Sequence, residues 1–473
     1  MVATQVSVSM SDSGGARSAV LSYYLFRVTD SVGFIWPVFT LFLLWNDLTF
    51  TQIGTLSAIS AVLVVVFEVP TGYLADRIGH RNTLAIGMGA TATSIAGFVA
   101  ASTFRQFVAL YVIWALANAL RHGAADAWLY EMLRERLDSD AFTRVRGRGG
   151  AVYQVVTAVT MIVGGLLYAV HPTYPFAASA VLSGLGVGAI LLMPQTDADA
   201  DQPGVTDALT TLRERFTRPS LRAFVPFIAL FFAMVTTADT YIQPITVDVI
   251  ERLSAALVPV AEDAVGRDGS SLILVAVILL LTRLCYLRRQ TLSAWILNSS
   301  FHVLTATSIS VPEEATLGFV YAGFALAGGI ASYNAERIRG WLGLRRALLA
   351  VPLVTAAALV FPLAVPLLAV PAFFLMRAAT DLSKPLVNQY LNDRAGSASR
   401  ATVLSAAQMS YAVVRAPLKP LVGVIADTTS PFGAIAALGG GFLIVGLSIV
   451  VVAQSVIADG PAVESTGVEE SAG

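Results

Sequence analysis

The sequence predicts an all-α integral membrane protein made of two transmembrane bundles of six helices each, and three observations lead to this fold class. Hydrophobic residues fill 56% of the 473 positions and charged residues only 13%, whereas a soluble domain carries about a quarter charged residues. Apolar runs of about 20 residues, long enough to cross a bilayer core as a helix, recur along almost the whole chain. The short alternating segments of a membrane β-barrel are not found.

A polar linker divides the expected helices into two sets. The linker, residues 194–221, holds an acidic run and then several arginines. It separates an N-terminal bundle (19–193) from a C-terminal bundle (222–453), and polar tails (1–18 and 454–473) flank the two. The twelve core helices are expected near 19–44, 52–75, 82–103, 106–131, 149–170, 174–193, 222–248, 316–335, 346–362, 364–384, 401–425 and 432–453.

The segment 250–312, between the seventh and eighth core helices, is longer than a loop that joins two helices of a twelve-helix protein needs to be. It contains an amphipathic stretch (251–268), an apolar run (272–287) and a second, more polar run. We favour a helical insertion that does not span the membrane fully. An extra spanning hairpin that places Arg288 and Arg289 inside is the alternative.

Arginine placement predicts the orientation, because loops on the cytoplasmic side of a membrane protein are enriched in Lys and Arg. With a cytoplasmic N-terminus, the inside loops hold nearly all loop arginines, and Arg105 is the clear exception outside. We therefore expect a multi-pass protein of the cell membrane, embedded in the lipid bilayer, with both termini cytoplasmic.

Composition also excludes several function classes. The only lysines, Lys384 and Lys419, each precede a proline, so no Gly-Lys-Ser/Thr loop for ATP phosphates can be written. Cys285 is the single cysteine, which rules out an intrachain disulfide or a cysteine-based metal cluster. The net charge of −1 gives no reason to expect nucleic-acid binding. No His-Glu-x-x-His motif is present, and we expect no enzyme, cofactor or metal site.

The most specific motif lies between the second and third expected helices. It reads Gly72-Tyr-Leu-Ala-Asp76-Arg77-Ile-Gly79-His80-Arg81-Asn-Thr-Leu84. Gly72 would let the second helix approach a neighbour closely, and Gly79 would permit a tight turn. The motif is similar to the loop pattern G-x-x-x-D-R-x-G-R-R-x-x-L of the major facilitator superfamily. A weaker copy, Gly343-Leu-Arg345-Arg346-Ala-Leu348, falls at the corresponding place in the second half, as in transporters built from structural repeats.

This resemblance implies an inner gate. Asp76 is expected to face the start of the eleventh helix, around Ser399–Ser405, and to hold the two halves together on the cytoplasmic side. His80 stands where the family has arginine, in a charge cluster with Asp126 or Glu131 at the end of the fourth helix. Either Arg81 substitutes, or the cluster titrates with His80, or His80 is a tolerated replacement.

Charged residues inside the expected helices are the candidates for a transport path, since each is costly in a membrane unless it is paired or faces water. They are Arg27 and Asp30 on the first helix, Arg121, His122 and Asp126 on the fourth, Asp239 on the seventh, Arg377 and Asp381 on the tenth, and Arg415 and Lys419 on the eleventh. The resemblance implies that helices 1, 4, 7 and 10 line a central cavity. The alternative is structural ion pairing, with Arg27, Asp126 and Asp381 reaching the inner membrane surface.

The sequence is therefore interpreted as a secondary active transporter that moves a small solute by alternating access. Proton-coupled efflux is the first hypothesis, although Gly164-Gly165 retains only the last pair of the helix 5 pattern of many drug–proton antiporters. Uptake or facilitated movement of a metabolite is the alternative, and a non-transporting receptor or scaffold is the rival from a different class.

The orientation can be tested by cysteine labelling. In a Cys285-free background, we expect single cysteines in the 194–221 linker to react only with reagents that reach the cytoplasmic side. Single cysteines at the start of the 250–312 insertion should react from outside. Labelling of the linker only from outside would reverse the assigned topology.

Overall fold

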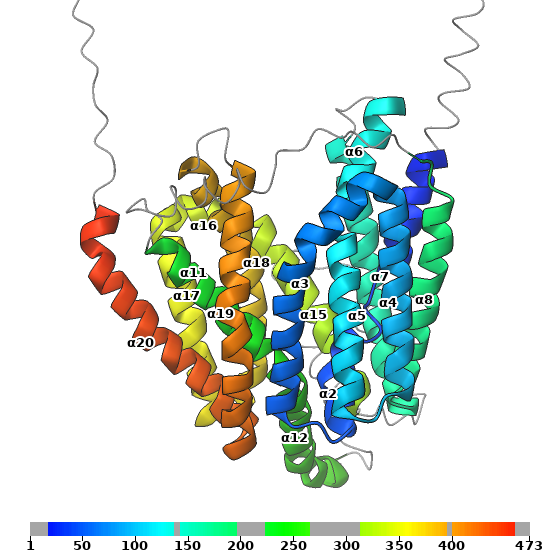
Figure 1. The fold of residues 1–473 in the computed structure, drawn as a ribbon. Coiled ribbons are helices and arrows are strands. Elements are labelled where there is room, and N and C mark those ends of the chain that lie inside the picture. The colour runs from blue at the N-terminus through cyan, green and yellow to red at the C-terminus, as the bar shows by residue number, and fades with distance from the viewer. Residues whose placement is uncertain (1–17, 137–141, 196–222, 265–312, 395–399, 459–473) are drawn as a thin grey trace, which may run out of the picture.

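The computed structural model describes residues 18–136, 142–195, 223–264, 313–394 and 400–458, and within these ranges it contains helices and no strand. Two groups of helices stand side by side with their axes roughly aligned (Figure 1). The predicted fold class, an all-α membrane protein of two helical bundles, is confirmed. Most of the 194–221 linker, the insertion beyond Ala264 and both tails lie outside the described residues.

The N-terminal bundle follows the expected order of helices. After the helix over residues 18–29 come η1 (Trp36–Val38), α2 (Phe39–Trp45), α3 (Phe50–Ile78), α4 (His80–Ala100), α5 (Phe104–Arg121), α6 (Ala124–Arg136), α7 (Phe142–Val170) and α8 (Tyr174–Leu191).

The C-terminal bundle repeats this order with local additions. Its elements are α11 (Phe224–Ala238), η3 (Asp239–Tyr241), α12 (Ile242–Ala264), α15 (Glu313–Tyr333), α16 (Ala335–Leu342), α17 (Leu344–Val360), η4 (Phe361–Leu363), η5 (Pro366–Leu368), α18 (Ala369–Arg394), α19 (Arg400–Thr428) and α20 (Pro431–Ala458).

The helices have the length and surface of membrane spans. Among the described residues, nine segments are long and apolar enough to cross a membrane. The two long helices outside this set, α18 and α19, carry more charged residues. Large apolar side chains on the outer faces are exposed, such as Ile444 (72%) and Val452 (79%). Such a surface would be a liability in water and is suited to lipid.

Two helices that were expected to be continuous are interrupted. The first ends at residue 29 and resumes at Trp36, and the fourth breaks between α5 and α6. In the fourth helix, Gly123 has φ +80°, outside the range of a right-handed helix. In the first, Pro37 stands in the first turn of the helix that resumes at Trp36, where its missing N–H is tolerated. A shorter irregularity, η3, interrupts the seventh helix at Asp239.

The internal repeat is present as a shared turn. Gly79, between α3 and α4, has φ 81° and ψ 152°, and Gly343, between α16 and α17, has φ 76° and ψ 149°. This backbone conformation is essentially restricted to glycine. The two related sequence motifs therefore build the same turn at the same place in each bundle.

Close contact between the bundles occurs along α3 and α19, at Gly54 and Gly423. A Cβ at Gly54 would meet the backbone of Lys419, and a Cβ at Gly423 would meet the backbone of Phe50. A Cβ at Gly72, in contrast, would meet no described atom within 4 Å, so the close approach expected there stays a prediction. The two helices meet near the start of α3 and diverge towards its end (Figure 1).

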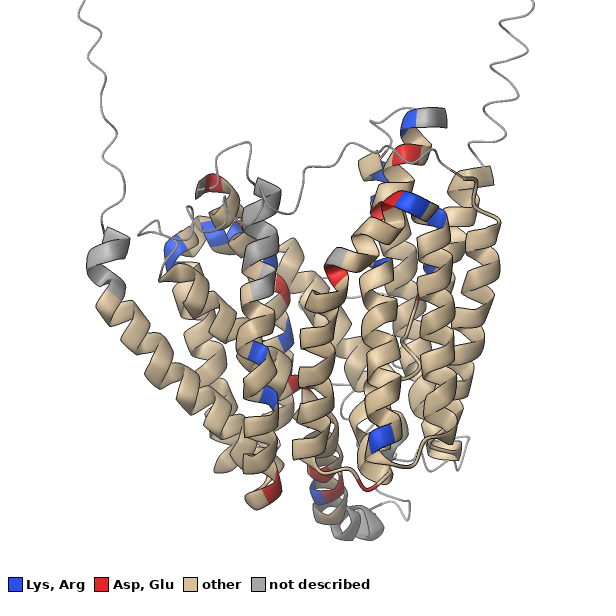
Figure 2. Cartoon of the chain, in the orientation of Figure 1, with Lys and Arg blue, Asp and Glu red and all other residues tan. Residues whose placement is uncertain are grey.

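The two ends of the molecule differ in charge. We call the end at which α3 passes into α4, and α16 into α17, the basic end; it carries most of the Lys and Arg residues of the helix termini (Figure 2). The opposite end, where α3 begins and α19 finishes, carries Arg105 and few other basic residues.

The shared turn can be tested by stability measurements. Gly79→Ala and Gly343→Ala should each destabilise the protein by about 1–3 kcal/mol, because alanine must adopt a glycine-only conformation. Gly72→Ala, at a helical position with open space, is the matched control and should be neutral or slightly stabilising. The melting temperatures of the three variants in detergent, measured by tryptophan fluorescence, test this ranking of stabilities. Equal melting temperatures for all three variants would contradict it.

Candidate transport cavity and its charged residues

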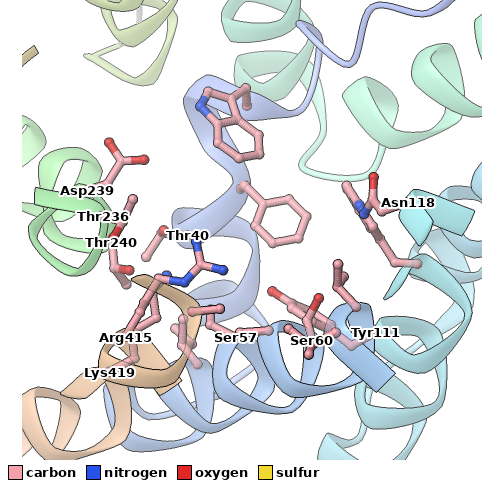
Figure 3. A pocket seen from close by; sticks show the side chains of 18 of the residues that line it. Thr40, Ser57, Ser60, Tyr111, Asn118, Thr236, Asp239, Thr240, Arg415 and Lys419 are labelled. Atoms are coloured by element: carbon pink, nitrogen blue, oxygen red, sulfur yellow. The ribbon is translucent and has the colours of Figure 1, made fainter. Parts of the chain in front are cut away.

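A cavity of about 580 Å³ lies between the two bundles. Its walls come from η1, α2, α3 and α5 of the first bundle, and from α11, η3, α12, α15 and α19 of the second. Aromatic side chains gather on the first-bundle side, and hydroxyl, amide and charged groups complete the lining (Figure 3). A cavity of this size and mixed character is typical of a small-molecule site.

Gln243 lines this cavity and is hydrogen-bonded to the backbone of the first bundle. Its side-chain oxygen accepts hydrogen bonds from the backbone amides of Thr40 (2.7 Å) and Leu41 (3.2 Å). Its side-chain nitrogen donates to the Trp36 carbonyl (2.8 Å) and to the Tyr321 hydroxyl (3.2 Å). Gln243 is buried and belongs to the second bundle, so these bonds fasten the interrupted first helix to the other half of the molecule.

Asp427 makes a second connection between the bundles at the opposite end. Its carboxylate accepts hydrogen bonds from the backbone amides of Phe50 (2.8 Å) and Thr51 (2.9 Å) and from the Thr51 hydroxyl (2.6 Å). These amides are at the start of α3, where helical N–H groups lack partners and favour a negative charge. We call this contact the Asp427 cap. It holds the end of α19 against the start of α3.

The cavity opens towards the basic end. Glu68 and His122, which line its rim, have exposed side-chain fractions of 39% and 75% and lie 3.8 Å apart. Glu68 stands on the part of α3 that runs to the basic end, and His122 directly follows the end of α5. The conformation is thus closed at the opposite end and open at the basic end.

The first-helix charges form a buried cluster away from this cavity. Asp30 is 9% exposed and accepts hydrogen bonds from Arg27 (2.8 Å) and from Arg121. Arg121 also donates to Thr91 (3.2 Å), and Arg27 lies over the Tyr153 ring. None of the three charged residues lines the 580 Å³ cavity. The cluster ties the interrupted first helix to the fourth helix within one bundle.

The corresponding pair in the second bundle does reach the cavity. Asp239, at the interruption of the seventh helix, pairs with Arg377 of α18, so both halves join their first and fourth helices through an aspartate and an arginine. Asp239 lines the central cavity, whereas Arg377 and Asp381 line a neighbouring cavity of about 520 Å³. Trp36 and Tyr321 separate the two spaces, since both residues line each of them.

Two of the predicted candidates for the transport path, Asp126 and Asp381, form ion pairs with partly exposed side chains. Asp126 accepts two hydrogen bonds from Arg146 (2.8 and 2.7 Å), and both side chains are about half exposed. Asp381 pairs with Lys384 at 2.8 Å, three residues further along α18. Asp126 lies outside the central cavity, and its geometry is that of an exposed ion pair.

The gate motif makes contacts within the first bundle. Arg81 donates to the carbonyls of Ile190 (3.3 Å) and Leu191 (2.8 Å) at the end of α8. Arg77 lies over the ring of Tyr73, 4.6 Å from its centroid. These contacts fix the turn between α3 and α4 to the same bundle.

His80 and Asp76 differ in their surroundings. His80 lies 3.1 Å from Glu131, so Glu131 rather than Asp126 is the acid that it meets. Asp76 is exposed, and among the described residues it has no ion pair. Residues 395–399 lie outside the described residues, as do the side chains of 401–406, so the expected partner of Asp76 is not described.

Sequence reasoning missed two contacts of this site. Asp427 gave no signal, because nothing in the sequence relates it to Phe50, 377 positions away. Gln243 likewise has no local pattern that relates it to the backbone of residues 36–41, more than 200 positions away. Within the described part of the chain, no group of three or more His, Cys, Asp or Glu residues could hold a metal ion.

Comparison with known proteins agrees with this architecture. The family model described as Major Facilitator Superfamily matches residues 19–261. An uncharacterized MFS-type transporter of Bacillus subtilis (strain 168), YxaM, is 26% identical over 146 residues, which are 31% of this chain and 36% of the relative. The aligned part is therefore about a third of that protein's length.

Solved transporter structures share the fold over almost the whole chain. The nucleoside transporter NupG aligns with a TM-score of 0.64 at 13% identity, covering 94% of this chain and 98% of that one. A bacterial homologue of the human lysosomal transporter Spinster aligns with a TM-score of 0.61 at 14% identity, covering 95% and 99%. Because the family model matches about half of its residues, the chain belongs to the Major Facilitator Superfamily.

Proposed function

We propose that this protein is a secondary active transporter that moves a small solute across the cell membrane by alternating access. The observation that carries the proposal is the cavity between the two bundles, which is closed at the opposite end and open at the basic end. A solute enters from the open side, and rocking of one bundle against the other then exposes it to the far side.

The orientation follows from the charge asymmetry of the two ends. The basic end faces the cytoplasm, because basic loops are retained on that side. Both termini and the 194–221 linker are then cytoplasmic, and the conformation described above is inward-open. An internal solute can enter this state directly, as export requires.

The second state of the cycle requires opposite changes at the two ends. The Asp427 cap and the bonds of Gln243 must break when the opposite end opens. We assign the contact between Asp76 and the start of α19 to that outward-open state, because Asp76 is exposed here and the basic ends of α3 and α19 stand apart. Each contact then stabilises one state.

Coupling to protons is assigned to Asp239 rather than to Asp30. Asp239 faces the cavity and has one arginine partner, Arg377. A proton from the cavity can neutralise this carboxylate while Arg377 remains close to other polar groups of the second cavity. Asp30 is enclosed by two arginines away from the cavity, which suits a structural role.

The Asp427 cap predicts a shift in conformational populations. Asp427→Ala removes an acceptor at a helix start, which costs about 0.5–2 kcal/mol, and thereby favours the outward-open state by up to about thirtyfold. Glu251→Ala, which removes an exposed carboxylate of α12 at the same end, is the matched control and should change nothing.

The populations can be measured as spin-label distances. Labels on cysteines at Ser102 and Val365, at the opposite end of each bundle, should report longer distances in Asp427→Ala than in the parent or in Glu251→Ala. A distance distribution that is unaltered by Asp427→Ala would contradict the role of the cap.

Transport and its coupling can be tested together in proteoliposomes with a broad panel of labelled solutes, with and without an imposed pH gradient. For the solute that is moved, Asp239→Asn should abolish gradient-driven transport and preserve solute exchange, because only the protonation step is lost. Asp30→Asn should instead lower stability by up to about 3 kcal/mol, since it leaves two partly buried arginines without a counter-ion. Full gradient-driven transport by Asp239→Asn would refute the coupling role.

A further inference from the structure

Two cations on one helix face line the central cavity. Arg415 and Lys419 are four residues apart on α19, a spacing that places them on the same side of a helix. Figure 3 shows both side chains at the cavity, with Ser57 and Ser60 of α3 nearby. Both residues are only partly buried, and their charged groups adjoin the cavity space.

Neither cation has a carboxylate partner in the described part of the chain. The two carboxylates that line the cavity are already engaged, Glu68 with His122 and Asp239 with Arg377. Two other partly buried arginines, Arg121 and Arg377, are each paired with an aspartate in the same structure. The cavity therefore carries two cationic side chains without a carboxylate partner among the residues that the structure describes.

Unpaired cations at membrane depth are costly, and the cost is reduced by an opposite charge or by water. An anion in the cavity would supply that charge. A guanidinium binds carboxylate or phosphate through two parallel hydrogen bonds, and an ammonium adds a compact positive charge beside it. The hydroxyls of Ser57 and Ser60 can complete the donor set.

The rest of the lining suits an apolar body on the same ligand. Trp36, Phe39, Tyr111 and Trp114 line the first-bundle side of the cavity. Flat aromatic surfaces of this kind stack on planar groups. The volume of about 580 Å³ is within the usual range for a small organic molecule.

We propose that the solute is a small organic anion whose carboxylate or phosphate group binds between Arg415 and Lys419, with a planar apolar body against the aromatic wall. This inference rests on the proposed transport function and names the solute class. Because both cations stand on α19, movement of α19 relative to α3 would carry the anion with it. The bound anion would also neutralise the two cations and so lower the free-energy cost of moving them through the membrane.

Binding can be measured on the purified full chain without any transport step. The probes are benzoate and phenyl phosphate, with benzamide and benzyl alcohol as neutral counterparts of similar shape. Quenching of the fluorescence of the cavity tryptophans and the shift in melting temperature report binding. Reconstitution into phosphatidylcholine, a lipid without net charge, removes anionic headgroups as a source of the same chemistry.

At least one anion should bind the parent protein, and neither neutral counterpart should. Arg415→Gln and Lys419→Gln should each weaken anion binding by about tenfold or more. Arg105→Gln, which removes an exposed arginine at the opposite end outside the cavity, should bind as the parent does. If a glutamine variant fails to fold, Arg415→Lys and Lys419→Arg keep the charge and should retain binding.

Neutral counterparts that bind as well as the anions, or glutamine variants that bind anions normally, would overturn the inference. If neither anion binds in phosphatidylcholine, while phosphatidylglycerol itself raises the melting temperature of the parent but not of Arg415→Gln or Lys419→Gln, the site holds a lipid headgroup, and this result would also overturn the inference. If the protein transports a neutral solute, and neither substitution changes that transport, the proposal of an anionic solute is refuted while the proposal of alternating access is not. Anion binding without any transport would refute the transporter and leave the site standing.

Discussion

The cost of holding charge inside an apolar helical bundle is the constraint on which this architecture depends. Asp30 and Asp239 each stand at an interruption of the first helix of their bundle, and each is bound by an arginine from the fourth helix, Arg121 or Arg377. These pairs join the first helix of each bundle to the fourth. Because a buried carboxylate without a partner is strongly disfavoured, the same charges also restrict how those helices can move.

The interrupted helices supply backbone groups as well as charges. Where the first helix breaks, the amides of Thr40 and Leu41 lack partners within a helix, and Gln243 of the other bundle accepts from both. A side-chain amide is suited to this place, since it joins the bundles without adding charge to the cavity lining. Irregular backbone within a membrane protein is tolerated where such partners exist.

In the alternating-access cycle that we propose, each end of α3 provides a contact for one of the two states. At its start, Asp427 of α19 accepts from free helical amides, and this contact closes one side. At its end, Asp76 is exposed on a turn that Arg81 fastens to α8. Hydrogen bonds to an exposed helix start contribute only modest free energy, so such contacts bias the populations of two states without locking either.

The sequence by itself determined the membrane class, the two bundles and the turns at Gly79 and Gly343, because these depend on local hydropathy and on a backbone conformation available to glycine. Only the tertiary structure decided which charges share a partner, that Asp30 is enclosed while Asp239 faces the cavity, and that Asp427 caps α3. Pairing between residues hundreds of positions apart leaves no local pattern. Such pairing is set by helix packing, and therefore by the direction in which each helix interruption points the side chains beside it.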